Sequence, residues 1–255
     1  MNSDKVADLR MGGLNWIMPL LFLLGWEGIA KLGLIDPTIL PAASKVGVTF
    51  IDLFKTGRVF DHITVSLKRM AAGFGISAIT GVSVGLAMGE FRTLYDLFQP
   101  LIELLRPLSP IALFPVFILV FGLGFLSKVA IIAWVCFFPI VLNTIEGVHS
   151  IDKVHRKAAL SMNASRLKMI RSVVIPGSSY WIITGLRIGA GSGFLALIAA
   201  EMIGATDGLG YFIIDASRRF QTEEMYAGIV LIGIIGYTTN AAFLFAESQV
   251  IKWRD

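Results

Sequence analysis

The chain has 255 residues, of which 55% are hydrophobic and only 16% are charged, with a net charge of +4. Soluble proteins carry about 25% charged residues, so this composition excludes an ordinary soluble domain and indicates an integral membrane protein. Basic residues in such a protein orient the chain in the bilayer, so the positive charge does not indicate a nucleic-acid partner. The only cysteine, Cys136, lies in an apolar run, which excludes an intrachain disulfide and a cysteine-based metal site.

Six apolar segments are long enough to cross a membrane. A hydrocarbon core of ~30 Å needs about 20 helical residues, and the segments of this length are 14–34, 70–89, 101–121, 129–148, 178–204 and 226–251. The first segment is long and lacks a small-residue cleavage site, so we expect a retained anchor rather than a signal peptide. The sequence therefore predicts an all-α polytopic membrane protein that forms a single domain over residues 1–255, with both termini on the same side.

The region between the first two segments is expected to be helical. Pro37 and Pro41 break the chain, and Ser44 is expected to cap a helix that runs to Gly57. Apolar residues at helical spacing over 58–70 predict a second amphipathic helix that leads into the next span. These helices would lie along the membrane surface, and a plain extracytoplasmic linker is the alternative.

Glycines and prolines indicate how the spans pack. Two ladders of small residues at every fourth position predict close helix packing; they are Gly81, Gly85 and Gly89, and Gly185, Gly189 and Gly193. Segment 101–121 contains Pro107, Pro110 and Pro115. Because backbone broken at membrane depth must border protein or a water-filled cavity, we expect this segment to face the interior of the bundle.

A polar, basic segment at 152–177 interrupts the apolar sequence. Apolar residues recur every three or four positions up to Met162 and again from Leu167, which predicts two short helices. Asn163 tolerates the left-handed conformation and is expected at the corner between them, and Pro176 is expected to end the second helix. This segment dominates the Lys and Arg bias near the span ends, so we place it and both termini in the cytoplasm. A solvated basic loop is the alternative.

This segment resembles the EAA loop of ABC-importer permeases, which reads EAA, three residues, Gly, and a later apolar pair before Pro. The matching residues are Lys157-Ala158-Ala159, Asn163 and Val173-Val174-Ile175-Pro176, with Lys in place of Glu and Asn in place of Gly. Further short motifs over about residues 35–240 are similar to permeases of the nitrate/sulfonate/taurine/bicarbonate branch. They are Ser66-Leu67-Lys68-Arg69, Pro100-Leu101, Arg106-Pro107, Leu113-Phe114-Pro115, Phe121-Gly122-Leu123-Gly124, Gly185-Leu186-Arg187, Ala199-Ala200-Glu201 and Gly208-Leu209-Gly210-Tyr211.

The resemblance implies the type I ABC-importer permease fold in the bacterial inner membrane. It implies a homodimer that works with two P-loop ATPase subunits and an extracytoplasmic substrate-binding protein. In that family the loop forms coupling helices that sit in a groove of the ATPase, here about residues 152–171; the residues carried over are Lys157, Ala158, Ala159, Met162, Asn163, Ala164 and Ser165. The implied substrate is a small oxyanion such as nitrate, bicarbonate, taurine or another sulfonate, although the branch also includes transporters of uncharged heterocycles and vitamin precursors.

Ionisable side chains inside the spans are candidates for the substrate pathway, because an unpaired charge there costs about 2.5 kcal/mol or more. Arg187 is the first candidate to attract an anion and Arg106 the second, since a guanidinium offers a fixed fork of donors. Glu201 lies about 21 Å from Arg187 along one helix, so each of the two needs a partner on another helix. The alternative roles are an interhelix ion pair or a snorkelling side chain. An ion-coupled secondary transporter would instead use Glu27 and Glu201.

The sequence contains no G-x-x-x-x-G-K-[ST] motif, so we expect ATP and Mg²⁺ to be bound by a partner ATPase and no cofactor or metal by this chain. It also lacks an HExxH motif, a nucleophile elbow and paired carboxylates, which argues against a membrane enzyme. A channel would need a selectivity filter or a ring of like charges. A structural subunit that uses the basic segment only to bind a partner is the remaining alternative.

Overall fold

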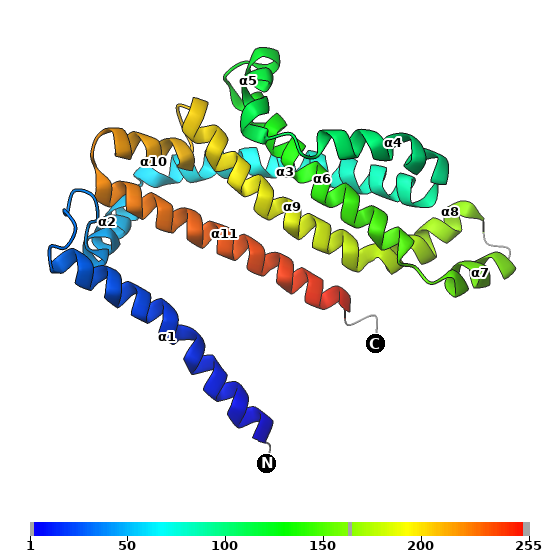
Figure 1. Cartoon of the computed structure of the whole chain (residues 1–255), viewed down its shortest axis with the longest axis horizontal. Coiled ribbons are helices and arrows are strands. Elements are labelled where there is room, and N and C mark those ends of the chain that lie inside the picture. The colour runs from blue at the N-terminus through cyan, green and yellow to red at the C-terminus, as the bar shows by residue number, and fades with distance from the viewer. Residues whose placement is uncertain (1–2, 163–164, 252–255) are drawn as a thin grey trace. The chain divides into compact units, whose positions relative to one another are not determined.

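Long apolar runs with few interruptions fold into a succession of helices. The computed structural model describes residues 3–162 and 165–251, and every regular element in these ranges is helical (Figure 1). The elements are α1 (Ser3–Lys31), α2 (Ala43–Lys55), α3 (Arg58–Glu90), α4 (Arg92–Leu105), α5 (Pro110–Phe121), α6 (Phe125–His149), α7 (Lys153–Ser161), α8 (Arg166–Met169), the π-helix η1 (Ile170–Val174), α9 (Ile175–Gly204), α10 (Leu209–Arg218) and α11 (Thr222–Ile251). The predicted all-α class is confirmed.

The helices group into two compact units. The first comprises Met1–Phe60 and Phe212–Leu231, and the second comprises Asp61–Tyr211 and Ile232–Asp255. The single permease domain over residues 1–255 stays a prediction.

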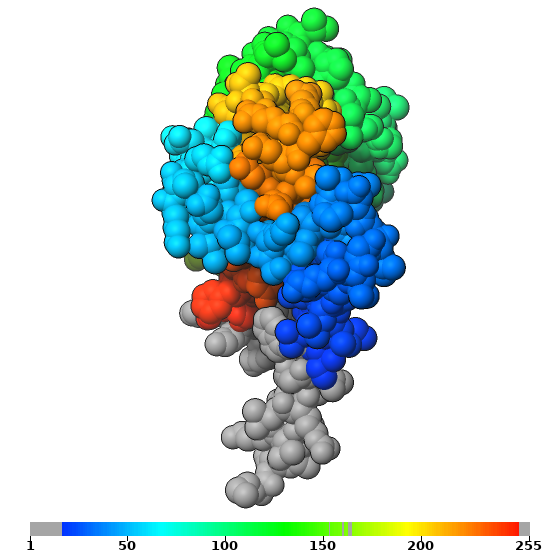
Figure 2. Space-filling model, turned by 90° about the vertical axis from the view of Figure 1, so that its left-hand side faces the viewer, coloured from blue at the N-terminus to red at the C-terminus, as the bar shows by residue number. Residues whose placement is uncertain are grey.

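In the first unit, the end of α1 is tied to the start of α2. The Glu27 carboxylate accepts hydrogen bonds from the Ser44 backbone N–H (3.0 Å) and hydroxyl (2.8 Å), and it pairs with Lys31 at 2.8 Å. The prediction that Ser44 caps the helix is therefore wrong: Ala42 occupies the N-cap without a side-chain bond, and the Ser44 hydroxyl reaches Glu27. Figure 2 shows α2 in blue and α10 in orange at the surface.

In the second unit, α6 is the central helix, and it packs against the glycine faces of α3 and α9. A Cβ atom on Gly85 of α3 would lie 2.6 Å from Thr144 Cβ, and one on Gly185 of α9 would lie 2.8 Å from Asn143 Cβ. Because both distances are shorter than any real contact, only glycine permits this approach. The predicted packing role of both glycine ladders is confirmed, and α3, α6 and α9 run side by side (Figure 1).

The described residues contain four helices that are long and apolar enough to cross a membrane, namely Arg58–Glu90, Phe125–His149, Arg166–Gly204 and Thr222–Gln249. The pair α4 and α5 would make a fifth, but it is bent by 100°. The sequence predicts six spans; its first, 14–34, falls in α1, whose side chains are described only from Ile17 on. The predicted run 101–121 is instead broken after Leu105, and its first half belongs to a helix that begins at Arg92.

The prediction that Pro176 ends the second short helix is wrong. Pro176 stands in the first turn of α9, where a missing N–H is tolerated. The preceding residues form the π-helix η1, so α8, η1 and α9 continue into one another from Arg166 to Gly204. A π-helical turn, whose hydrogen bonds span five residues, thus precedes the proline and keeps the chain helical there.

Candidate functional site

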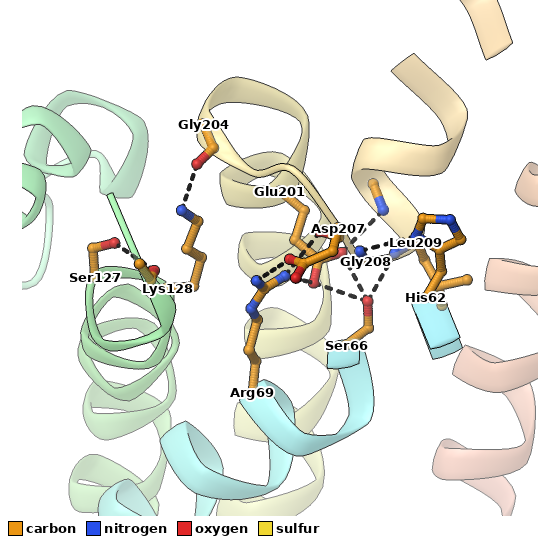
Figure 3. A network of polar contacts seen from close by, with 12 residues as sticks. His62, Ser66, Arg69, Ser127, Lys128, Glu201, Gly204, Asp207, Gly208 and Leu209 are labelled. Atoms are coloured by element: carbon orange, nitrogen blue, oxygen red, sulfur yellow. Dashed lines mark hydrogen bonds and ion pairs between the residues drawn. The ribbon is translucent and has the colours of Figure 1, made fainter. Parts of the chain in front are cut away.

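Glu201 of α9 is the centre of a buried charged cluster in the second unit (Figure 3). Its carboxylate accepts hydrogen bonds from the Ser66 hydroxyl of α3 at 2.8 Å, from Arg69 Nη1 at 2.9 Å and from the Gly210 backbone N–H at 3.0 Å. Its exposed fraction is 0%, and that of Arg69 is 5%. The buried carboxylate is thus satisfied by a cation and two further donors, and the ion pair fastens α3 to α9, although the buried Arg69 Nε has no partner among the described residues.

Two further charges extend the cluster. Arg69 also binds Asp207, through both the side chain and the backbone carbonyl, the latter at 3.0 Å. Lys128, at the start of α6, is 1% exposed and donates to the carbonyls of Leu123 and Gly204. Lys128 thereby satisfies the Gly204 carbonyl oxygen, which has no helical partner at the end of α9. The cluster therefore joins α3 to the end of α9 and the start of α6 (Figure 3).

The turn between α9 and α10 contributes backbone N–H groups to this cluster. Gly208 has φ of +103°, a conformation that other residues rarely adopt, and a Cβ there would overlap the Glu201 carboxylate. Its N–H donates to His62 Nδ1 at 3.2 Å, and the next N–H, of Leu209, donates to the Ser66 hydroxyl at 2.8 Å. The backbone of this turn is thus bound by residues of α3.

Arg187, the first candidate for attracting an anion, forms an ion pair with a carboxylate of another helix. Its Nη1 lies 3.1 Å from Glu247 Oε2 of α11, and Glu247 is largely buried. The requirement that Arg187 and Glu201 each find a partner on another helix is confirmed. Both residues form the interhelix ion pairs that the sequence left open as the alternative.

Arg106, the second candidate, has a different setting. It lies in the turn between α4 and α5, it is exposed, and it makes no ion pair with any residue whose side chain the structure describes. It lines a cleft of about 530 Å³ with the start of α5 and with side chains of α6 and α9. Of the three pathway candidates, Arg106 is the one whose guanidinium remains available to a solute.

The basic segment 152–177 is held against the end of α3. Arg156 of α7 pairs with Glu90 at 3.0 Å and donates to the Val148 carbonyl at 3.1 Å. The Arg166 guanidinium lies 5.0 Å from the centre of the Phe91 ring, a cation–π contact. The predicted pair of short helices is present as α7 and α8, and the Ser165 hydroxyl caps α8 by accepting from the Lys168 N–H.

The surface of this segment differs from the prediction at one residue. Ala159 was expected on the docking face, but it is only 5% exposed and packs inside the chain. The exposed apolar side chains are Val154 (66%), Met162 (77%) and Leu167 (60%), while Lys157, Ala158 and Ser165 are also exposed. Asn163 and Ala164 lie outside the described residues.

Sequence reasoning did not identify Arg69 or Lys128 as candidate site residues, although Arg69 belongs to one of the motifs shared with the permease branch. The signal that could have found them is their position, because each stands at the boundary of a long apolar run, Arg69 before 70–89 and Lys128 before 129–148. A charge there is either at the membrane surface or turned inward to a partner. The fully buried carboxylate of Glu201 required such a partner.

Four membrane-length helices, three of which pack through glycine ladders, define a polytopic membrane protein. Among the described residues, no group of three or more His, Cys, Asp or Glu side chains could hold a metal ion. The chain belongs to the family of binding-protein-dependent transport system inner membrane components, whose model matches residues 78–248. It is therefore a permease subunit and not a catalytic enzyme.

The chain is 34% identical to the taurine transport system permease protein TauC of Escherichia coli, over 89% of this chain and 85% of that protein. It is 31% identical to the nitrate import permease protein NrtB of Synechocystis, over 74% of this chain and 69% of that protein. The solved MetNI methionine ABC transporter aligns with a TM-score of 0.69 and 16% identity, over 75% of this chain and 95% of that chain. The predicted type I permease fold is confirmed, and the family excludes the ion-coupled secondary transporter.

Proposed function

We propose that this chain forms the translocation pathway of an ATP-driven importer for a small oxyanion, such as taurine, another sulfonate, bicarbonate or nitrate. The similarity to taurine and nitrate permeases supports this substrate class. Two copies of the chain would assemble with two P-loop ATPase subunits, which bind ATP and Mg²⁺, and with an extracytoplasmic substrate-binding protein. The importer would reside in the bacterial cytoplasmic membrane, with the termini and the segment 152–177 in the cytoplasm.

The observation that carries the proposal is the exposed surface of α7, α8 and the turn that follows α7. Val154, Met162 and Leu167 expose apolar side chains on a segment that is otherwise polar. Exposed apolar groups with a polar surround are typical of a protein interface. Because Arg156 and Arg166 fix this segment to the end of α3, a force on it would reach the spans.

The positive charge of this surface indicates the charge that its partner would carry. Lys157, Arg166, Lys168 and Arg171 are exposed cations, and Lys157 stands where the EAA pattern has Glu. Opposite charges at an interface favour association and like charges disfavour it. The ATPase groove would therefore present carboxylates to Lys157. ATP-driven closure of the ATPases would move residues 152–171 and so switch the spans between inward- and outward-facing states, which is a coupling between two sites.

The pathway residues would have separate roles. Arg106 would attract the oxyanion, because its guanidinium has no protein partner among the described residues. Arg187 and Glu201 would hold the helices that frame the pathway, through Glu247 and Arg69 respectively. Their substitution would then affect folding and transport together.

The test is co-purification from native membranes with a tag on the C-terminus. One P-loop ATPase per permease chain is expected, and Met162→Asp or Leu167→Asp should reduce that ratio because each places a charge on the apolar surface. Val48→Asp is the matched control, since Val48 is also an exposed apolar residue (69%) on an amphipathic helix, α2. The absence of any ATPase from folded, unsubstituted protein would overturn the proposal, and equal loss in the control would overturn the docking role of this surface.

A further inference from the structure

The helix α10 ends in a cap that has an aromatic residue at the position usual for glycine. The Gln221 N–H donates to the Ala216 carbonyl at 2.9 Å, and the Phe220 N–H donates to the Ser217 carbonyl at 3.1 Å. These two bonds form a Schellman motif, in which the residue at the position of Phe220 is left-handed and is usually glycine. Phe220 has φ of +57°, and it is the one non-glycine residue with positive φ in the described part of the chain.

The end of α1 has the same motif with the usual residue. The Leu34 N–H donates to the Ile29 carbonyl at 3.4 Å, and the Gly33 N–H donates to the Ala30 carbonyl at 3.3 Å. Gly33 has φ of +66°, and glycine adopts this conformation without the steric cost that a Cβ atom brings. The chain therefore accepts at Phe220 a cost that it avoids at Gly33, and an outlier of this kind points to a function.

The Phe220 side chain does not repay this cost by packing within the chain. It is 87% exposed, more than any other large hydrophobic side chain that the structure describes. Single exposed apolar residues are common on protein surfaces, but this one is also held in a costly backbone conformation. Aromatic side chains are enriched in protein interfaces, where a few of them provide most of the binding energy. Phe220 therefore has the properties of an anchor for another protein.

Phe220 borders a cleft of about 560 Å³ in the first unit, and most of the charges in its wall are negative. The charged side chains that line the cleft are Asp52, Arg58, Glu223 and Glu224. Arg58 pairs with Glu224 at 3.0 Å, and Glu223 lies 3.9 Å from the exposed Lys45. Asp52 is exposed and forms no ion pair with any side chain that the structure describes. Its carboxylate is therefore available to a cationic group of a partner.

We propose that Phe220 and this cleft form the docking site for the extracytoplasmic substrate-binding protein. The matching surface of that protein has an apolar socket for the Phe220 ring and a Lys or Arg side chain that pairs with Asp52. In the proposed orientation, the segment between the spans α9 and α11 is extracytoplasmic, as this partner requires. The carboxylates of the cleft would repel an anionic lipid surface. The proposal rests on the proposed importer function and identifies where one of its partners binds.

The first experiment places a photocrosslinking residue at two positions of the full chain in native membranes. Phe220→p-benzoylphenylalanine should give an adduct with a substrate-binding protein, identified by mass spectrometry. Val154→p-benzoylphenylalanine is the matched control, because Val154 is also an exposed apolar residue (66%) but lies on the proposed cytoplasmic side. It should give an adduct with the ATPase and none with the binding protein. An adduct of position 220 only with lipid or with a second copy of the chain would overturn the proposal.

The second experiment measures the affinity of the crosslinked binding protein, once purified, for the importer in nanodiscs. Phe220→Gly should weaken binding about tenfold, because it removes an aromatic anchor. The same variant should unfold at an equal or higher concentration of denaturing detergent, because glycine is favoured at this position of the cap. Leu34→Gly is the control, since Leu34 is an exposed apolar residue (70%) in the turn after α1 and outside the cleft; it should leave the affinity unchanged.

The charge of the cleft is tested in the same titration at several salt concentrations. Asp52→Asn should weaken binding and reduce its dependence on salt, because it removes one charge from the interface. Asp61→Asn removes an exposed carboxylate outside the cleft and should do neither.

Two results of these titrations would overturn the docking site. They are an unchanged affinity in Phe220→Gly, and an affinity that falls only in proportion to a lowered stability of that variant. Such a failure is distinguishable from failure of the importer function. ATP-dependent uptake of an oxyanion by the reconstituted system, together with the ATPase adduct at position 154, would leave the importer function intact. Loss of the ATPase adduct and of all ATP-dependent uptake would refute that function too.

Discussion

Replacing Glu201 with Gln should cost about 3 kcal/mol of unfolding free energy. Glutamine keeps the size of the side chain but removes the charge, so Arg69 loses its buried partner, and the Gly210 N–H and Ser66 hydroxyl lose a charged acceptor. Breaking a buried ion pair from one side costs about 3–5 kcal/mol. Asp207 still binds Arg69 in the variant, so we expect the lower end of this range.

The assay is reversible unfolding of the full chain in mixed micelles as the denaturing detergent increases. Glu103→Gln is the control, because Glu103 is exposed and its recorded contact is Gln99, one turn away at 2.6 Å; surface changes of this kind stay within about 0.5 kcal/mol. Arg69→Gln and the double variant complete a cycle, in which the coupling should exceed about 1 kcal/mol. A loss below about 1 kcal/mol for Glu201→Gln, or purely additive effects, would refute the reasoning that this cluster fastens α3 to α9.

Three other substitutions test separate parts of the molecule. Gly85→Ala should destabilise the chain by about 1–3 kcal/mol through overpacking against Thr144, whereas Gly75→Ala on the same helix has no neighbour within 4 Å and should be neutral or stabilising by up to about 1 kcal/mol; equal effects in the same unfolding assay would contradict the packing of α3 on α6. Arg187→Met and Glu247→Gln should each cost about 2 kcal/mol, between the values for exposed and buried pairs, and should lower transport and stability in parallel; transport lost from a fully stable Arg187→Met protein would show instead that Arg187 serves the solute. Lys157→Glu should weaken ATPase association about tenfold by placing like charges together, measured by titration of the ATPase, and Lys157→Gln should fall between the two; stronger binding of the Glu variant would mean that the groove is basic.

The sequence predicts well those features that depend on one helix at a time. Length and hydrophobicity identify four membrane-length helices in the described residues, and spacing of glycines identifies the faces of α3 and α9 that meet α6. These patterns are local, because a helix repeats every 3.6 residues whatever it packs against. The motif around Lys157 is local too, and it leads to the family.

Features that depend on two distant segments could not be predicted. Arg69 and Glu201 are 132 residues apart, and nothing in either neighbourhood indicates which cation meets which carboxylate. Ser is a common N-cap residue, yet the Ser44 hydroxyl donates to the Glu27 carboxylate of another helix. The break after Leu105 was partly predictable, because a residue before proline avoids the helical conformation, and both Arg106 and Ser109 precede prolines. The angle of 100° between α4 and α5 was not, since tertiary packing decides it.

The chain is continuously helical from α8 through η1 into α9. Measured along the helix, its 39 residues correspond to about 58 Å, nearly twice the thickness of a hydrocarbon core. At one end Arg166 makes a cation–π contact with Phe91, and at the other end the Gly204 carbonyl accepts a hydrogen bond from Lys128. We expect a displacement at Arg166 to be transmitted along this helix to Gly204, and the π-helical turn at Ile170–Val174 to be the place where the helix can bend.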